Sequence, residues 1–143
     1  MALYLIVTLA GERVALPAAA VDSVVEIEKI TPVPLAPRHI AGLAALRSRV
    51  LTIIDSATAL GLPPAAPREV RQLAVVTVDG HLYGIEVDAI EDVVDTAAPA
   101  EPLRGALSPG WSGAARGAIE IDGRTLLLLD PAALVAPPAA RAA

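Results

Sequence analysis

The chain contains an internal duplication, and this feature constrains its fold more than any other. Residues 6–25 (IVTLAGERVALPAAAVDSVV) align without a gap onto residues 75–94 (VVTVDGHLYGIEVDAIEDVV), an offset of 75 − 6 = 69. Residues 42–57 (GLAALRSRVLTIIDSA) align onto residues 117–132 (GAIEIDGRTLLLLDPA), an offset of 117 − 42 = 75. Each half repeats the same order of apolar segments, which predicts two similar structural units.

Short apolar segments separated by turn signals predict an all-β fold. Residues typical of tight hairpin turns occur at four places: Ala10-Gly11, Arg47-Ser48-Arg49, Asp79-Gly80 and Asp122-Gly123. The run VLTII at 50–54 is apolar or β-branched throughout, which is typical of a strand covered on both faces. Five such strands per half are best buried by closing the sheet on itself. We therefore expect two small five-stranded SH3-like barrels, packed together, with short helical turns.

The second hairpin of each half is predicted to end in a short helix. Asp55 can accept a hydrogen bond from the free amides of the next turn, and Gly61 can take the left-handed conformation that ends it. Asp130 occupies the same position in the second half and is followed by Pro131, which is favoured at the first helical position. Both aspartates are thus interpreted as helix caps.

A single domain spanning residues 1–143 is expected. It would comprise a first barrel at 3–62, a linker at 63–71, a second barrel at 72–135 and a frayed tail at 136–143, with the possibility that strands cross between the barrels. The linker is placed where proline and charge replace the strand pattern. Further loops are expected at 31–38, which is rich in proline, and at 98–113.

Composition excludes several classes of partner and site. Eleven basic and sixteen acidic residues give a net charge of −5, and the chain has one Trp, two Tyr and no Phe, so a nucleic-acid surface is not expected. The absence of cysteine excludes disulfides and thiolate chemistry, and a reducing cytoplasm fits it. The apolar amino terminus lacks the positive flank of a signal peptide and is too short to cross a bilayer.

No converging set of reactive groups is visible, so neither an enzyme, a metal site nor a cofactor site is expected. His39 lies in the proline-rich loop and His81 in a hairpin turn, and both are interpreted as solvated histidines rather than as a metal or acid–base pair. The capping role of Asp55 and Asp130 explains these two carboxylates without catalysis. Neither GxSxG nor a phosphate-binding glycine loop is present.

Two further features each have a structural and a functional interpretation. An acidic strip, expected around a helical turn of the second half, comprises Glu86, Asp88, Glu91, Asp92 and Asp95. We favour a solvated face over a binding site for a basic partner. Trp111 is the sole tryptophan. A tryptophan in such a loop more often covers the end of a barrel than anchors a binding partner, so we favour the first role.

Aliphatic residues in and after the third predicted strand are either ordinary core or an exposed patch that marks a protein partner. The sequence leaves these two interpretations open for Val21, Val24, Ile27, Val33 and Leu35. A groove for proline-rich peptides is not expected, because three aromatic residues can hardly build one.

The segment 42–62, GLAALRSRVLTIIDSATALGL, resembles the CheW-like domain, the module of bacterial chemotaxis coupling proteins and of the regulatory part of their histidine kinases. The family pattern is Gly-Val-x-x-Leu-Arg-Gly, an aliphatic strand, Asp-Leu and a short amphipathic turn that ends Gly-Leu. Residues 20–27, AVDSVVEI, lie where the family has Val-x-Glu-Ile. The similarity extends over about residues 3–134 and implies a double barrel.

This resemblance implies a non-catalytic cytoplasmic scaffold that links the cytoplasmic tip of a chemoreceptor to the regulatory domain of a histidine kinase. By its match to the Leu-Arg-Gly and Val-x-Glu-Ile motifs, the receptor would contact Val21, Ser23, Val24, Leu46 and Arg47. An arginine fork can fix the register of a docked helix by binding a carboxylate or a helix-end carbonyl. We expect the kinase to contact the remaining aliphatic residues, Ile27, Val33 and Leu35.

The chain departs from the family pattern at Ala45, Ser48 and Ser23, where the family often has Asn, Gly and Glu. The second repeat has Asp122 where the first has Arg47, so only the first keeps the arginine. Two alternatives to a chemotaxis adaptor are an adaptor in a pilus-type or other signalling array, and a double barrel that binds a small molecule. Neither the receptor, the kinase nor self-association is specified by these residues.

Overall fold

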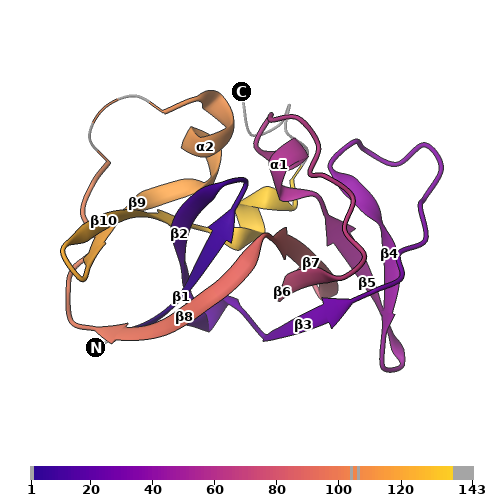
Figure 1. The fold of residues 1–143 in the computed structure, drawn as a ribbon, viewed down its shortest axis with the longest axis horizontal. Helices are drawn as coiled ribbons and strands as arrows, with labels where there is room; N and C mark the ends of the chain where they lie inside the picture. Colours follow the sequence, from indigo (N-terminus) through magenta and orange to yellow (C-terminus); the bar gives the residue numbers. More distant parts are fainter. Residues whose placement is uncertain (1, 104, 106, 137–143) are drawn as a thin grey trace.

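The structure, a computed structural model, describes residues 2–103, 105 and 107–136. Of the expected tail at 136–143, only Ala136 lies within the described residues. Two five-stranded sheets lie side by side, with short helical turns between some of their strands (Figure 1). The all-β prediction is confirmed. Within the described part of the chain, no helix is long and apolar enough to cross a membrane.

The first sheet, here called barrel A, has the strand order β8-β1-β2-β10-β9. Its strands are β1 (Ala2–Leu9), β2 (Glu12–Pro17), β8 (Ala89–Thr96), β9 (Ala115–Ile121) and β10 (Arg124–Leu129). The second, barrel B, has the order β3-β6-β7-β5-β4. Its strands are β3 (Ser23–Ile27), β4 (Ile40–Leu46), β5 (Arg49–Ile54), β6 (Arg71–Val78) and β7 (His81–Val87). Neighbours pair antiparallel except β2 with β10 and β5 with β7.

Barrel membership does not follow the ranges 3–62 and 72–135 given by the repeat. Barrel A takes β1 and β2 from the first half and β8 to β10 from the second, whereas barrel B takes β3 to β5 and then β6 and β7. The crossing of strands between barrels, which the sequence left open, therefore involves both halves. A repeat reports which segments share a pattern, but strand pairing is decided by packing in three dimensions.

A glycine in each barrel allows the edges of its sheet to meet. In barrel B, Thr31 and Leu43 exchange two backbone hydrogen bonds of 2.8 Å, which connect the segment after β3 to β4. A Cβ atom on Gly42 would lie 2.5 Å from the carbonyl oxygen of Thr31. Barrel A has the equivalent bridge between Glu101 and Ala118, and a Cβ atom on Gly117 would lie 2.7 Å from the oxygen of Glu101. Only glycine permits this approach.

The predicted helix caps are confirmed. The Asp55 carboxylate accepts a hydrogen bond from the Thr58 amide at the start of α1 (Ser56–Ala59), and Gly61 has φ +79°. The Asp130 carboxylate accepts one from the Ala132 amide at the start of η2 (Pro131–Leu134). The other helical turns are η1 (Ala18–Ala20) and α2 (Pro109–Ala114).

The largest hydrophobic cluster lies between the barrels rather than inside either of them. Successive residues of a strand point to opposite faces; accordingly Val7 of β1 faces this inter-barrel core, whereas Ile6 faces the smaller core of barrel A. In barrel B, Val76 faces the inter-barrel core and Val75 the interior of the barrel. Both faces of the central strands are therefore covered, which explains their continuous apolar sequences.

Candidate functional site

The two histidines do not form a site, and one of them was interpreted wrongly. His81 is exposed in its turn, but His39 is buried, with only 1% of its surface accessible. The His39 ring Nε2 lies 2.8 Å from the backbone oxygen of Val135, and Nδ1 has no partner among the described residues. The Asp55 amide donates to the His39 carbonyl, which holds this end of the loop against β5. His39 therefore joins the start of β4 to the C-terminal segment. Among the described residues, no cluster of potential ligands could hold a metal ion.

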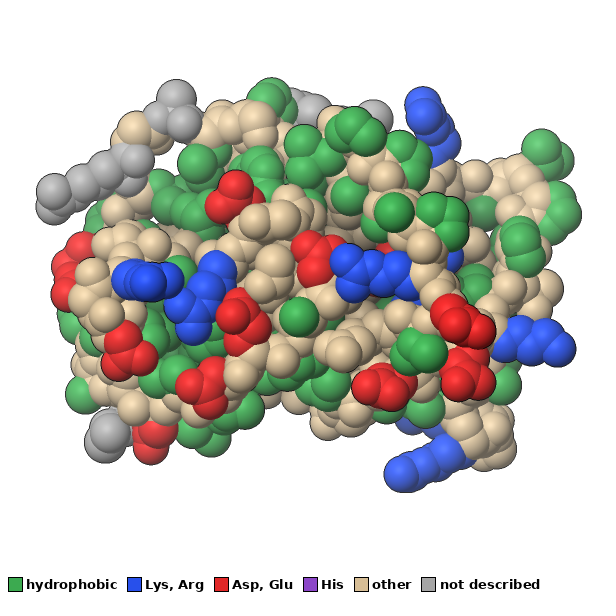
Figure 2. Space-filling view, viewed as in Figure 1, with side chains coloured by type: hydrophobic (Ala, Val, Ile, Leu, Met, Phe, Trp, Pro, Cys, Tyr) green, Lys and Arg blue, Asp and Glu red, His purple; other side chains and the backbone are tan. Residues whose placement is uncertain are grey.

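The acidic strip does not surround a helical turn, because residues 89–96 form strand β8. Several of its carboxylates are paired with arginines across neighbouring segments: Arg13 with Glu91 at 3.3 Å, Arg68 with Asp88 at 3.6 Å and Arg71 with Glu86 at 3.0 Å. The face shown in Figure 2 accordingly has acidic and basic side chains interspersed over both barrels. This pattern does not favour a binding site for a strongly basic partner.

Trp111 covers the inter-barrel core instead of the end of one barrel. It is half-buried and packs against that core from helix α2. The neighbouring Gly110 lies so close to the end of α1 that a Cβ atom there would be 1.8 Å from the Leu60 carbonyl oxygen. Trp111 thus belongs to the packing of the two helical turns over the joint between the barrels.

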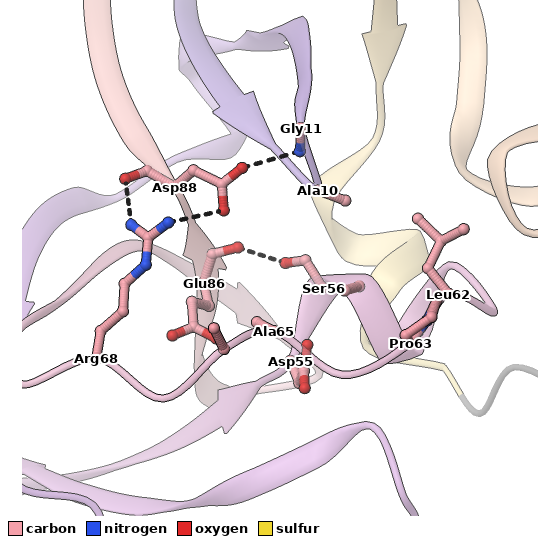
Figure 3. Close-up of a pocket in the computed structure, with 12 residues that line it drawn as sticks. Ala10, Gly11, Asp55, Ser56, Leu62, Pro63, Ala65, Arg68, Glu86 and Asp88 are labelled. Carbon is pink, nitrogen blue, oxygen red and sulfur yellow. Dashed lines mark hydrogen bonds and ion pairs between the residues drawn. The ribbon is translucent and has the colours of Figure 1, made fainter.

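Polar groups gather around a pocket of about 320 Å³ where the 62–68 segment, α1 and the β1–β2 hairpin meet (Figure 3). Glu86, which is 7% exposed, is held by Arg71, and the Ser56 hydroxyl donates to the Glu86 carbonyl at 2.5 Å. Burial raises the pKa of Glu86, and the nearby Arg71 guanidinium partly opposes this rise. Each carboxylate here is occupied by a structural partner, so the pocket offers no acid–base pair.

Exposed or half-buried apolar side chains border the inter-barrel core on both barrels; we call these residues, Leu3, Val21, Val24 and Val93, the inter-barrel rim. In barrel A, Val93 is 58% exposed and lies opposite the buried Leu5, and Leu3 is 51% exposed on the same face of β1. In barrel B, Val24 is 44% exposed and lies opposite Ala74 of the inter-barrel core. Val21 is half-buried against that core.

The rim includes two of the residues assigned to the receptor, Val21 and Val24, and adds Leu3 and Val93, which sequence reasoning missed. The repeat indicates Val93, because this residue occupies the position equivalent to Val24, since 24 + 69 = 93. Ser23 is exposed at the start of β3. The sequence left open whether these aliphatic residues are core or exposed. In the structure Val24 is exposed and Val21 is half-buried.

Leu46 and Arg47 lie at the turn between β4 and β5 of barrel B. Arg47 is exposed with φ +57°, and no ion pair or hydrogen bond of its side chain occurs within the described part of the chain. Leu46 is half-buried and packs against the core of barrel B. The assigned receptor residues thus lie on two elements, β3 with the residues just before it and the β4–β5 hairpin.

A second apolar surface is a groove of about 750 Å³ between the end of β3 and strands β4 and β5; we call it the β3–β4 groove. It is lined by Glu26, Ile27, Glu28, Lys29, Thr31, Leu43, Ala44, Ala45, Val50 and Val70. Ile27 was assigned to a partner, but Leu43, Val50 and Val70 were missed. Val50 is 65% exposed, so the expectation that 50–54 is covered on both faces is wrong at its first residue.

Val33 and Leu35, also assigned to the kinase, lie in the proline-rich loop beyond Thr31 and do not line the groove. Both are exposed, and Leu35 adopts φ +62°. The assigned kinase residues are thus divided between the groove and a neighbouring loop.

Comparisons with known proteins agree on one family. A model of the CheW-like domain matches residues 3–138. The chain is 32% identical over 101 residues to chemotaxis protein CheW of Rhizobium meliloti (strain 1021), an alignment that covers 70% of this chain and 65% of that protein. It is 34% identical over 119 residues to a probable chemotaxis protein CheW of Rhizobium etli, covering 78% of this chain and 75% of that protein.

The fold is similar to the crystal structure of the scaffolding protein TtCheW from Thermoanaerobacter tengcongensis. The TM-score is 0.76 at 22% sequence identity, and the match covers 90% of this chain and 84% of the other. This likeness confirms the double-barrel architecture. Because the family model spans nearly the whole chain and both relatives exceed 30% identity, the chain belongs to the CheW-like domain family.

Proposed function

We propose that this protein is a chemotaxis scaffold that couples the cytoplasmic tip of a chemoreceptor to the regulatory domain of a histidine kinase, at membrane-associated receptor arrays. The observation that carries the proposal is the presence of two separate apolar surfaces, the inter-barrel rim and the β3–β4 groove. A coupling protein must bind two partners at once, which requires two surfaces that do not overlap.

The inter-barrel rim suits the tip of a helical bundle. An amphipathic helix presents apolar side chains along one face and binds where aliphatic anchors are exposed in a row. Val24 and Val93 supply such anchors on barrels B and A, and Leu3 extends the row along β1. Ser23, at the start of β3, can donate a hydrogen bond where the family often has a carboxylate. Arg47, exposed at the tip of the β4–β5 hairpin, adds a charged contact for the same receptor tip.

The β3–β4 groove suits the barrel of a kinase regulatory domain. Its apolar lining combines Ile27 with the exposed side chains of Leu43, Val50 and Val70, and its margin carries Lys29 and two glutamates. An apolar centre with a charged margin is the usual anatomy of a protein interface. Val33 and Leu35 lie on the loop that continues from the groove and would extend the same contact.

The test is a crossed pair of variants measured by isothermal titration against two purified probes from the same genome. The probes are a coiled-coil hairpin of a chemoreceptor tip and the regulatory domain of the chemotaxis kinase. We expect Val93→Asp to weaken only the receptor probe and Val50→Asp only the kinase domain, because each charge would be buried in one interface. Thr125→Asp, an exposed position on β10, is the matched control.

Equal loss of both probes in either variant would show that the surfaces are not separate. Failure of the unmodified protein to bind either probe would contradict the chemotaxis role itself.

A further inference from the structure

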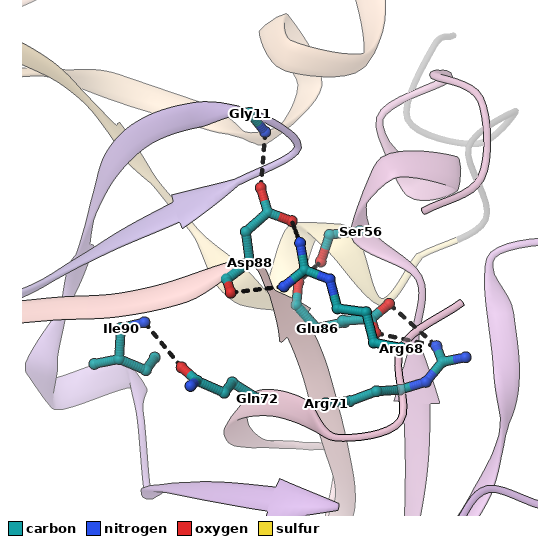
Figure 4. Close-up of polar contacts among 8 residues, drawn as sticks. All are labelled: Gly11, Ser56, Arg68, Arg71, Gln72, Glu86, Asp88 and Ile90. Atoms are coloured by element: carbon teal, nitrogen blue, oxygen red, sulfur yellow. Dashed lines mark hydrogen bonds and ion pairs between the residues drawn. The ribbon is translucent and has the colours of Figure 1, made fainter. Parts of the chain in front are cut away.

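Polar contacts converge on Asp88, at the point where the chain passes from β7 of barrel B to β8 of barrel A. Its carboxylate accepts a 2.9 Å hydrogen bond from the Gly11 amide, in the β1–β2 hairpin of barrel A. Arg68, from the segment that leads into β6 of barrel B, lies 3.6 Å from the same carboxylate and donates to the Asp88 carbonyl at 2.9 Å (Figure 4). Asp88 therefore joins the two barrels and the connecting segment.

Two more polar contacts lie beside Asp88. The Asp88 amide donates to the Thr8 carbonyl at 2.7 Å. The side-chain oxygen of Gln72, at the start of β6, accepts from the Ile90 amide of β8 at 3.0 Å. These bonds connect barrel A to barrel B at one end of the strands β1 and β8, as Figure 4 shows for Gln72 and Ile90. Val93 and Leu3 of the inter-barrel rim lie further along these strands, away from these polar contacts.

The apolar core between the barrels constrains the angle between them through the shapes of its packed side chains. The hydrophobic effect itself depends on the area buried and not on direction. Hydrogen bonds, in contrast, weaken steeply when their geometry is changed. The directional contacts of Asp88 and Gln72, together with that of His39 with the Val135 carbonyl, can therefore favour a single arrangement of the barrels.

A small rotation at this polar end would be amplified at the rim. Val93 is five residues beyond Asp88 along the chain, a distance of about 17 Å in an extended strand. At that distance a rotation of about 10° shifts the strand by about 3 Å, comparable to the spacing of one residue in a strand. The position of Val93 and Leu3 relative to Val24 thus depends on the Asp88 contacts.

We propose that Asp88, through Gly11 and Arg68, is a positioning residue that fixes the angle between the barrels and so the geometry of the inter-barrel rim. The consequence for receptor binding rests on the function proposed above, whereas the effect on the barrels does not. Asp88 need not touch the receptor to control its affinity.

The experiment measures the distance between barrels by pulsed electron paramagnetic resonance. The chain has no cysteine, so Arg49→Cys in β5 and Thr125→Cys in β10 place one spin label on an exposed position of each barrel. We expect Asp88→Ala to broaden or shift the distance distribution. Asp88→Asn keeps an oxygen acceptor for the Gly11 amide and should restore most of the original distribution.

Arg13→Gln is the matched control, because it breaks the Arg13–Glu91 ion pair within barrel A at a similarly exposed arginine. We expect it to leave the distribution unchanged. An unchanged distribution in Asp88→Ala, or an equal broadening in Arg13→Gln, would overturn the proposal. If Asp88→Ala does not fold, Arg68→Gln and Gln72→Leu are measured instead, and an unchanged distribution in both overturns it.

The same variants are then titrated with the receptor-tip probe. We expect Asp88→Ala to weaken binding by about two- to thirtyfold, the range seen when a remote residue modulates a site, and Asp88→Asn to recover it. A broadened distance distribution with unchanged affinity would leave the positioning of the barrels intact but contradict binding at the rim. The failure of one proposal is thereby distinguished from that of the other.

Discussion

The hairpins β4–β5 and β9–β10 are equivalent elements of the two repeats, but they differ in the side chain at one equivalent position. Both begin with a glycine that admits a backbone bridge and end in a capping aspartate. Between these points, barrel B has Ala44 where barrel A has Ile119, by the offset of 75. The small Ala44 side chain belongs to the core of barrel B and also lines the β3–β4 groove, whereas the larger Ile119 fills the core of barrel A. Equivalent positions of the two hairpins thus differ in side-chain volume.

The largest effect is expected from truncating the core of either hairpin. Leu51→Ala removes a fully buried side chain and should lower the free energy of unfolding by about 2–5 kcal/mol. Leu126→Ala, at the equivalent position of barrel A, should cost a similar amount. Urea unfolding measures both. A near-neutral Leu51→Ala would mean that β5 does not carry the core of barrel B.

The bridge glycines provide the next test. Gly42→Ala and Gly117→Ala each place a Cβ atom within 2.7 Å of a backbone oxygen, at φ +153° and +156°. We expect losses of about 1–3 kcal/mol in unfolding free energy, of the order of other backbone strains. Thermal unfolding of both variants measures the loss. A loss in only one would show that the two barrels do not close in the same way.

Arg47 and Asp122 occupy equivalent turns and test whether the hairpin tip of barrel B, but not that of barrel A, contacts the receptor. Arg47→Ala should weaken binding of the receptor-tip probe by about 1–3 kcal/mol, as expected for truncation of an interface arginine. Because the Arg47 side chain is exposed and has no bonded partner in the described part of the chain, the melting temperature should stay the same. Asp122→Ala is the control and should change neither. A shift in melting temperature as large as the loss of binding would make Arg47 structural.

Glu86 has no counterpart in the first repeat, where Pro17 occupies its position, since 17 + 69 = 86. Burial raises its folded pKa above the ordinary 4.5, although Arg71 opposes this rise, so the folded protein holds this proton more tightly than the unfolded chain does. The contribution of Glu86 to the free energy of unfolding should therefore decrease as the pH rises from 4.5 through the pKa of Glu86 in the folded protein. In Glu86→Gln this contribution is absent.

Urea unfolding of the native protein and of Glu86→Gln at a series of pH values measures this effect. The stability of the native protein relative to the variant should decrease across that window. A relative stability that rises with pH would show that the attraction of Arg71 outweighs burial.

A small effect on stability is expected from Val50→Thr, which gives barrel B the residue that barrel A has at Thr125. Since Val50 is 65% exposed, the free energy of unfolding should change by less than about 0.5 kcal/mol. Binding of the kinase regulatory domain should weaken measurably, because the groove loses a methyl group and gains a hydroxyl. Unchanged binding would remove Val50 from the proposed kinase surface.

Local features were predicted well, because they depend on neighbouring residues. The caps Asp55 and Asp130 and the turn at Arg47 follow from hydrogen-bonding groups and turn preferences that act within a few residues. The burial of His39 could not be predicted, because its partner Val135 lies 96 residues away in the chain. Val50 was misjudged for a similar reason: its exposure depends on how far β3 stands from β4.

The sequence by itself determined the two repeats, the strands, the caps and, through its motifs, the family. The tertiary structure alone decided which strands share a barrel, because patterns of apolar residues specify faces and not partners. It also decided that Val24, Val93 and Leu3 border one inter-barrel core and that Asp88 joins both barrels. These properties arise from contacts between segments distant in the chain, which packing selects after the local elements have formed.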